Sequence, residues 1–181
     1  MANFKQYQDD AYRTCKVMEA NVYNSIHMVL GITSEYLETK EALEIVNNFT
    51  GAVDEHIALT EGLKKEVGDV LWYTALLAKF NNLDFSRGHG FMPMTIDKAV
   101  ETLNSVYKAN WIYDRAMMAP DKTGYTLEQQ VQWAIYNIIL WIESTFPFKL
   151  QDIMDVNIAK LKERFPDKFE ADLANNRKED L

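Results

Sequence analysis

The chain of 181 residues has room for one domain at roughly 150 residues per domain, and its 48% of hydrophobic residues exclude an intrinsically disordered protein. Seven glycines and four prolines are few for a turn-rich protein, so the composition favours helices over a β-sandwich or barrel. The formal net charge of −8 disfavours binding along a nucleic-acid polymer, and a single cysteine excludes an internal disulfide.

Apolar residues recur at spacings of three and four in the first part of the chain and predict two helices there. The first covers residues 4–15. The second begins at Asn21 or Asn24, either of which can cap it, and runs on towards Val46. Gly31 is expected to interrupt this second helix near its middle.

A third helix is expected after the polar break at residues 47–51, with Asp54 as its cap and its end near Asn81. This helix and the one before it are long, and their apolar stripes are expected to face inward. The inward positions of the two helices include Leu30, Leu37 and Ile57.

The second half of the chain predicts three more helices. Residues 86–93 are the clearest loop, because two glycines and a proline resist helix formation. Thr95 can cap a fourth helix, and Thr126 with Gln129 forms the pattern of a capping box that opens a fifth. A last amphipathic helix covers about 150–163. No segment alternates with a period of two or resembles a glycine-rich phosphate loop, so the predicted fold class is all-α.

Two of these helices each carry a pair of carboxylates three residues apart, Glu35 with Glu38 and Glu66 with Asp69. Residues at this spacing share a helix face, so antiparallel packing would bring four acids together. Carboxylates among apolar neighbours need cations or protons, and oxygen ligands favour Mg²⁺, with Mn²⁺ as a substitute, over zinc. A di-iron site would need Glu-x-x-His pairs, which the sequence lacks. One such pair occurs by chance on exposed helices, whereas two pairs favour a metal site.

The last predicted helix carries a polar stripe of Asn157, Lys160 and Arg164 at spacings of three and four. Such a stripe suits phosphate oxygens. Taken separately, Lys160 and Arg164 also fit a solvated basic face near a helix C-terminus. Only the combination of this stripe with the acid pairs favours phosphate binding.

The acid pairs and the last helix resemble the MazG-like nucleotide pyrophosphohydrolases of the all-α NTP pyrophosphatase superfamily. Residues 31–38 are similar to the first half of the family signature, Glu-x-x-Glu, and residues 63–73 closely resemble the second half, Glu-x-x-Asp. Residues 155–166 resemble the closing helix of the family. The resemblance implies one all-α domain over 1–181. Residues at about 84–149 are extra relative to the family, and their own apolar stripes predict a helical pair that extends the bundle or covers a surface others use for dimerisation, with a lid for the substrate as the alternative.

The resemblance implies Mg²⁺-dependent hydrolysis of a nucleoside or deoxynucleoside triphosphate between the α and β phosphates, which gives a monophosphate and pyrophosphate and controls the nucleotide pool. The metal ligands would be the four acids, Glu35, Glu38, Glu66 and Asp69. Glu38 and Glu66 are the expected catalytic residues, and Glu38 would orient or deprotonate the attacking water. The expected substrate-binding residues are Asn157, Lys160 and Arg164 at the phosphates, with Trp72 and His27 as candidates for the base, for which core packing is the alternative role.

Two other functions remain open on the sequence alone. One is a related pyrophosphatase that acts on phosphoribosyl-ATP or an alarmone, and the other is a non-enzymatic helical regulator that binds metal or nucleotide. The resemblance implies a homodimer or homotetramer. No apolar stretch approaches the roughly 20 residues of a membrane span and no signal-like segment lies near the N-terminus, so we expect a cytoplasmic protein without membrane contact.

Overall fold

The computed structural model describes residues 2–86, 88, 92–112, 116–118, 120–122 and 124–170. Within these residues the chain forms six helices and no strand, which confirms the predicted all-α class. The helices are α1 (Phe4–Arg13), α2 (Asn21–Asn48), α3 (Val53–Phe80), α4 (Ile96–Ile112), α5 (Leu127–Thr145) and α6 (Leu150–Arg164). In the described part of the chain, no helix combines the length and the apolar character that crossing a membrane requires. Four residues of the predicted loop lie outside the described ones: Arg87, His89, Gly90 and Phe91.

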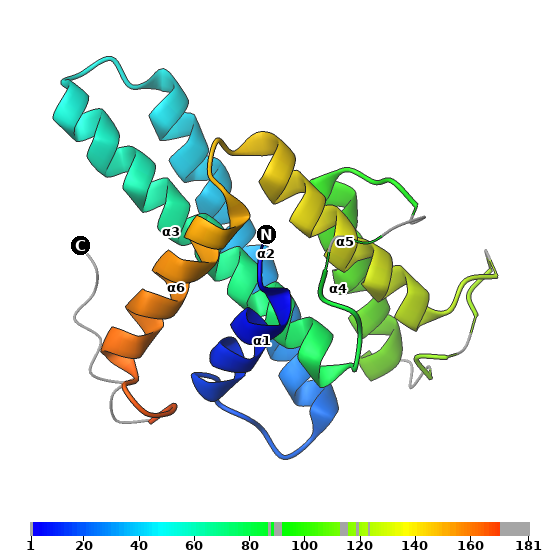
Figure 1. Ribbon diagram of the computed structural model, residues 1–181. Coiled ribbons are helices and arrows are strands. Elements are labelled where there is room, and N and C mark those ends of the chain that lie inside the picture. The colour runs from blue at the N-terminus through cyan, green and yellow to red at the C-terminus, as the bar shows by residue number, and fades with distance from the viewer. Residues whose placement is uncertain are drawn as a thin grey trace.

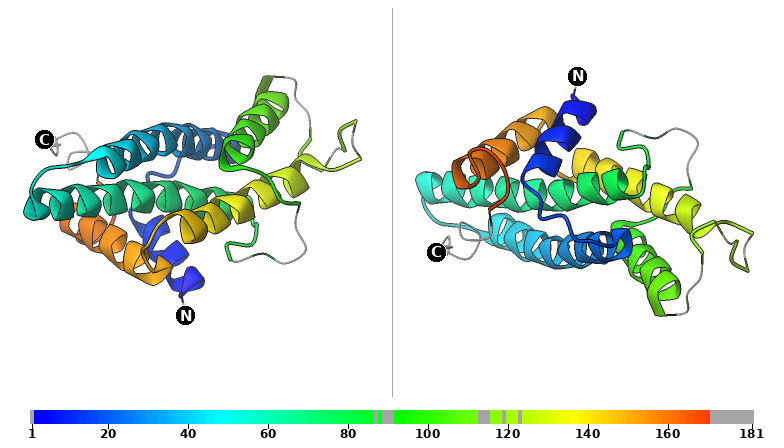
Figure 2. Two further views of the ribbon diagram at one scale, coloured as in Figure 1. Left: turned by 90° about the horizontal axis from the view of Figure 1, so that it is seen from above. Right: turned by 90° about the horizontal axis from the view of Figure 1, so that it is seen from below.

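The long helices α2 and α3 form an antiparallel hairpin at the centre of the molecule (Figures 1 and 2). Helices α1 and α6 pack on α3 and on each other. Helix α4 packs on α2, α5 packs on α3, and α4 and α5 also pack together. The extra helical pair therefore extends the bundle along both helices of the hairpin.

Helix α3 is the most enclosed part of the fold, because it contacts α1, α2, α5 and α6. Its second half is buried on nearly every side, from Val67 to Ala78. Helix α5 supplies a row of fully buried isoleucines, Ile135, Ile138, Ile139 and Ile142. Burial of this apolar surface is the main stabilising contribution to the fold, and it holds α3 in a fixed place between its neighbours.

The predicted caps of the extra helical pair are confirmed. The backbone N–H of Lys98 donates to the Thr95 hydroxyl at 3.2 Å, which caps the first turn of α4. At the start of α5, Thr126 and Gln129 make both reciprocal hydrogen bonds of a capping box. These bonds satisfy backbone donors that the first helical turn leaves without partners.

The predicted caps of α2 and α3 are wrong. The residue before α2 is Ala20 and the residue before α3 is Ala52, and neither makes a side-chain cap. The amide of Asn24 instead bonds to the backbone of Met18, at 2.8 Å to its nitrogen and 3.1 Å to its oxygen. Asp54 lies inside the first turn of α3, where its negative charge still interacts favourably with the positive end of the helix dipole.

Three apolar residues that the periodicity places inward are exposed, so this part of the prediction is wrong. Leu30 is 61% exposed, Leu37 is 54% exposed and Ile57 is 55% exposed. Leu30 and Leu37 are two helical turns apart and share a face of α2 that solvent reaches. Ile57 lies near the start of α3, and this end of the hairpin extends beyond the other helices (Figure 1). Each long helix meets its neighbours over only part of its length, so an apolar stripe does not mark buried residues throughout.

Gly31 does not interrupt α2, which continues through it. It is buried, and an added Cβ atom would lie 2.2 Å from Cε1 of Tyr73 on α3. We expect Gly31→Ala to lower the free energy of unfolding by about 1–3 kcal/mol, because the Tyr73 ring would have to move. The control is Gly62→Ala in α3, where no atom lies within 4 Å of an added Cβ, and it should raise stability by about 0.5–1 kcal/mol. Urea unfolding checks both values, and an unchanged midpoint for Gly31→Ala would contradict this packing.

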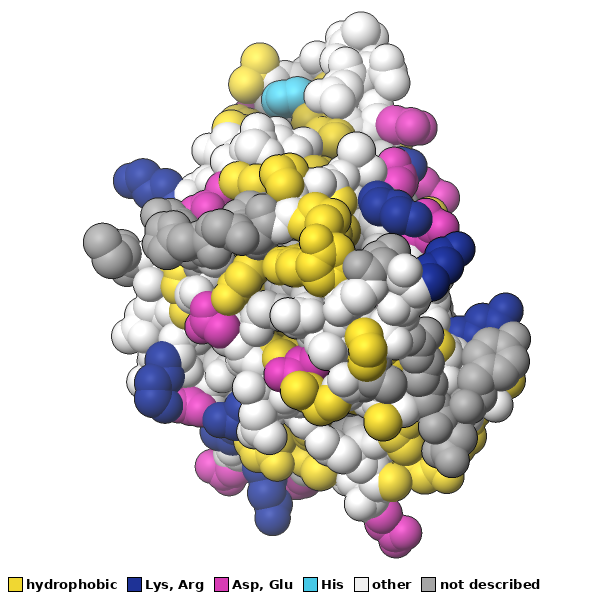
Figure 3. Space-filling view, turned by 90° about the vertical axis from the view of Figure 1, so that its right-hand side faces the viewer, with side chains coloured by type: hydrophobic (Ala, Val, Ile, Leu, Met, Phe, Trp, Pro, Cys, Tyr) yellow, Lys and Arg dark blue, Asp and Glu magenta, His cyan; other side chains and the backbone are white. Residues whose placement is uncertain are grey.

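Figure 3 views the molecule from the side on which α4 and α5 lie and shows apolar side chains among the charged ones on that face. The exposed apolar residues of the extra helical pair include Met92, Trp111, Ile112 and Leu140. The Trp111 ring meets the ring of Tyr23 from α2 edge to face, with centroids 5.1 Å apart. The extra helices thus contribute their buried side to the core and leave part of their outer side apolar.

Candidate metal centre

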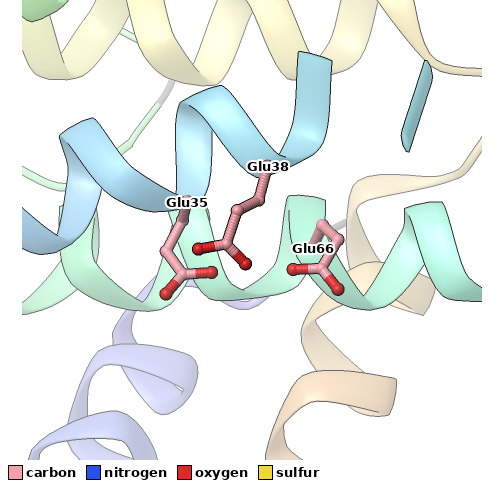
Figure 4. A group of neighbouring side chains, drawn as sticks. All are labelled: Glu35, Glu38 and Glu66. Carbon is pink, nitrogen blue, oxygen red and sulfur yellow. The ribbon is translucent and has the colours of Figure 1, made fainter. Parts of the chain in front are cut away.

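The antiparallel hairpin brings the two predicted acid pairs together. Glu35 and Glu38 reach from α2 towards α3, where the carboxylate of Glu66 lies beside them (Figure 4). One oxygen atom from each of these three residues lies within 4.8 Å of the other two. The spacing of three residues places both α2 acids on the same side of the helix, which is why the cluster forms. Three convergent carboxylates form a small anionic site between the two helices.

The cluster carries strong electrostatic repulsion. Glu35 and Glu66 are half-buried and Glu38 is exposed. Burial, and then the charges of Asp69, Glu38 and Glu66, raise the pKa of Glu35 to about 7. Burial and the charge of Asp69 also raise the pKa of Glu66. A divalent cation would relieve this repulsion, and carboxylate oxygens are the donors that Mg²⁺ and Mn²⁺ prefer. The donor set therefore fits such an ion.

Asp69, the fourth predicted ligand, lies next to the cluster with both carboxylate oxygens engaged. The side-chain amide of Asn157 donates to Oδ1 at 2.8 Å, and the Lys160 ammonium donates to Oδ2 at 2.7 Å. Both partners come from α6, which packs on α3. Lys160 is thereby placed beside the glutamates, and its positive charge lowers the pKa of Glu35 and Glu66 against the larger effects that raise it.

The buried amide of Asn157 is held on its other side by Tyr7 of α1. The Tyr7 hydroxyl donates to Asn157 Oδ1 at 2.9 Å. Gly68 allows the close approach of α6, because an added Cβ there would lie 3.1 Å from Cβ of Asn157. Burial and the charge of Asp69 raise the pKa of Tyr7, so its hydroxyl stays protonated and remains a donor.

Sequence reasoning missed Tyr7 as a site residue, because it lies in the apolar stripe of its helix. A tyrosine in such a stripe brings a hydroxyl that needs a buried partner, and this was the signal available.

Trp72 and His27 both contact the ring of Tyr73. Tyr73 contacts Trp72 at a centroid distance of 4.8 Å and His27 at 6.1 Å, both edge to face. The Trp72 indole N–H donates to the Thr14 hydroxyl at 3.2 Å. Burial, and then the charge of Lys16, lower the pKa of His27. These contacts account for packing roles, and contact of Trp72 and His27 with a base stays a prediction.

Arg164 is the last residue of α6, one turn beyond Lys160. Its guanidinium lies over the ring of Phe165, 5.1 Å from the ring centre. The structure therefore brings Asn157 and Lys160 to the acids and leaves the phosphate role of Arg164 as a prediction.

Searches against protein-family models, curated proteins and solved structures find no match for this chain.

The raised pKa of Glu35 predicts a pH-dependent response to metal. Between its ordinary value of 4.5 and about 7, Glu35 holds a proton in the folded protein that the unfolded chain has lost. The folded state then binds more protons, so the stability that Glu35 contributes falls as the pH rises through this range. Mg²⁺ competes with that proton for the Glu35 carboxylate, and Mg²⁺ stabilises the folded state because it binds to the folded protein. We expect Mg²⁺ to raise Tm more at pH 8 than at pH 5.5.

Thermal unfolding with and without Mg²⁺ at both pH values measures this difference. Glu35→Gln should reduce the pH dependence of the Mg²⁺ effect, since its amide does not titrate, and the raised pKa of Glu66 accounts for the part that remains. Glu41→Gln is the matched control, because Glu41 lies on the same helix and is exposed. An equal Tm increase at both pH values in the unaltered chain would contradict the role of Glu35.

Proposed function

We propose that this protein is a Mg²⁺-dependent nucleotide pyrophosphohydrolase that cleaves a nucleoside or deoxynucleoside triphosphate between the α and β phosphates, giving a monophosphate and pyrophosphate. The observation that carries the proposal is the three-carboxylate cluster of Glu35, Glu38 and Glu66, with the ammonium of Lys160 held beside it on Asp69. The site combines donors for a divalent cation with a positive charge for phosphate oxygens. The resemblance of both acid pairs and of α6 to MazG-like enzymes supports the same reaction.

The three glutamates would hold the ion from two helices. Bound there, Mg²⁺ neutralises part of the triphosphate charge and lowers the pKa of a water molecule. Glu38 is the exposed member of the cluster, so its carboxylate can orient the attacking water and accept its proton. From α3, Glu66 would complete the set of carboxylates that holds the ion.

Lys160 and Asn157 have different roles in this proposal. The Lys160 side chain is 32% exposed, so its ammonium can reach a phosphate oxygen and stabilise negative charge there. Asn157 is only 1% exposed and keeps Asp69 in place through its amide. Arg164 would meet the phosphates further along α6, and Trp72 and His27 would contact the base.

The proposed partner is a small nucleotide rather than a nucleic-acid polymer, in keeping with the net charge of −8. A homodimer or homotetramer, which the resemblance implies, and a cytoplasmic location, which the sequence favours, also belong to the proposal.

The test is a panel of canonical and modified NTPs and dNTPs incubated with the protein and Mg²⁺. Product separation distinguishes monophosphate plus pyrophosphate from diphosphate plus phosphate. We expect the first pair from a subset of the panel, with no turnover when EDTA removes the metal. Cleavage of only phosphoribosyl-ATP or an alarmone would redirect the assignment to a related pyrophosphatase. No turnover with verified folding and Mn²⁺ binding would favour a regulator.

A further inference from the structure

The extra helical pair is fastened to the part of α2 that carries the acids. From α4, the side-chain amide of Asn104 donates to the Thr33 hydroxyl at 3.0 Å. The hydroxyl of Tyr36 donates in the other direction, to Oδ1 of Asp97, at 2.6 Å. Thr33 and Tyr36 lie on either side of Glu35 in the chain. Two hydrogen bonds between α2 and α4, one in each direction, therefore hold the helical turn of Glu35.

The ring of Tyr36 is enclosed by both helices of the extra pair. It is only 5% exposed, although it follows a metal-site residue in the sequence. Trp141 of α5 meets it edge to face, with centroids 5.5 Å apart. Lys40 lies 5.3 Å over the same ring and 3.6 Å from Asp97, an exposed pair that contributes little by itself. The hydrogen bond and the ring packing fix the rotation of α2 about its axis.

The same aromatic packing continues to the other metal helix. Trp141 contacts Phe146 at 5.1 Å, and Phe146 stacks on Phe148 at 6.4 Å. The ammonium of Lys64 on α3 lies 5.8 Å over the ring of Phe148. Lys64 is two residues before Glu66. The segment that ends the extra pair thus contacts α3 close to the third carboxylate.

Rotation of α2 matters for metal binding because Glu35 and Glu38 must point at Glu66 on another helix. A small turn of α2 about its axis would swing both carboxylates away from Glu66. Metal affinity depends on such orientation. In other metal sites, affinity falls when a group that only orients a ligand is removed. The contacts of Tyr36 oppose this rotation.

We propose that Tyr36 and Asp97 are positioning residues of the metal centre. Through these two residues, the extra helical pair sets the affinity of the metal centre for a divalent cation. This inference rests on the proposed metal site and not on the identity of the substrate. It assigns the extra pair a role beyond extending the bundle.

The experiment measures Mn²⁺ binding to the full chain without nucleotide, by electron paramagnetic resonance of free Mn²⁺. Tyr36→Phe keeps the ring and removes the hydroxyl, whereas Asp97→Ala removes the acceptor. Each should raise the Kd for Mn²⁺ by about three- to tenfold, the change that corresponds to one net hydrogen bond. The double variant should bind no more weakly than either single one. Asp97→Asn keeps an acceptor oxygen and should recover most of the affinity.

The matched control is Tyr23→Phe, because Tyr23 lies on the same helix, is 46% exposed and contacts Trp111 instead. Its Kd should equal that of the unaltered chain. Asp97 is 71% exposed, so its variants keep the test valid if Tyr36→Phe fails to fold.

A lower Tm with unchanged Mn²⁺ affinity in the Tyr36 and Asp97 variants would mean a structural role only and would overturn the inference. Absence of Mn²⁺ binding by the unaltered chain would overturn the metal site and the inference together. Normal Mn²⁺ binding without cleavage of any nucleotide would overturn the proposed reaction alone.

Discussion

Glu66→Gln should abolish nucleotide cleavage and leave the helical fold intact. The amide keeps the size of the side chain and removes the negative charge that α3 adds to the cluster. We expect kcat/KM to fall by more than about hundredfold, since even groups that only orient a metal ligand cost about 10–100-fold when removed. Without Mg²⁺ at pH 8, the variant should unfold at a higher temperature, because a neutral amide removes the cost of burying a charge and the repulsion by Asp69, which together raise the pKa of Glu66.

The control for this variant is Glu61→Gln on the same helix. Glu61 is exposed, and its carboxylate lies 3.9 Å from the Lys64 ammonium at the surface. Its substitution should leave kcat/KM and Tm close to those of the unaltered protein. Turnover by Glu66→Gln near the original rate would exclude the cluster from the reaction.

Lys160→Met should separate the phosphate role from the metal role. Methionine keeps most of the length of the side chain and removes the charge that meets Asp69 at 2.7 Å. Loss of one positive group at the phosphates should lower kcat/KM by about hundredfold or more. Mn²⁺ affinity without nucleotide should stay the same or rise, because Asp69 then adds uncompensated negative charge beside the glutamates.

Lys162→Met is the matched control, since Lys162 is an exposed lysine two residues along the same helix. Steady-state kinetics and a Mn²⁺ titration on both variants give the comparison. A loss of Mn²⁺ binding in Lys160→Met equal to its loss of activity would show that Lys160 supports the metal site rather than the substrate.

Local features of the fold were predictable from the sequence because local rules govern them. The caps of α4 and α5 depend on a threonine and the three residues after it, and both were identified. The start of α2 at Asn21 was identified as well, but its cap was not, because the amide of Asn24 is used by the backbone of Met18 in the preceding connection. A cap residue is recognisable only when no other group competes for its side chain.

In the candidate site, too, the features that depend on local spacing were predictable and those that depend on packing were not. A spacing of three residues along a helix was enough to select Glu35, Glu38 and Glu66, which the hairpin brings together. The groups that surround them come from distant parts of the chain: Tyr7 and Asn157 are 150 residues apart in sequence. No periodicity within one helix indicates such a pairing, because it depends on how α1 and α6 pack on α3.

The most direct test of the metal centre is the anomalous scattering of Mn²⁺ in crystals of this protein. We predict a peak within bonding distance of the carboxylates of Glu35, Glu38 and Glu66, between α2 and α3. Crystals of the Glu66→Gln variant, prepared in the same way, should lack that peak. Mn²⁺ bound elsewhere, with the three carboxylates unliganded at saturating metal, would contradict the account.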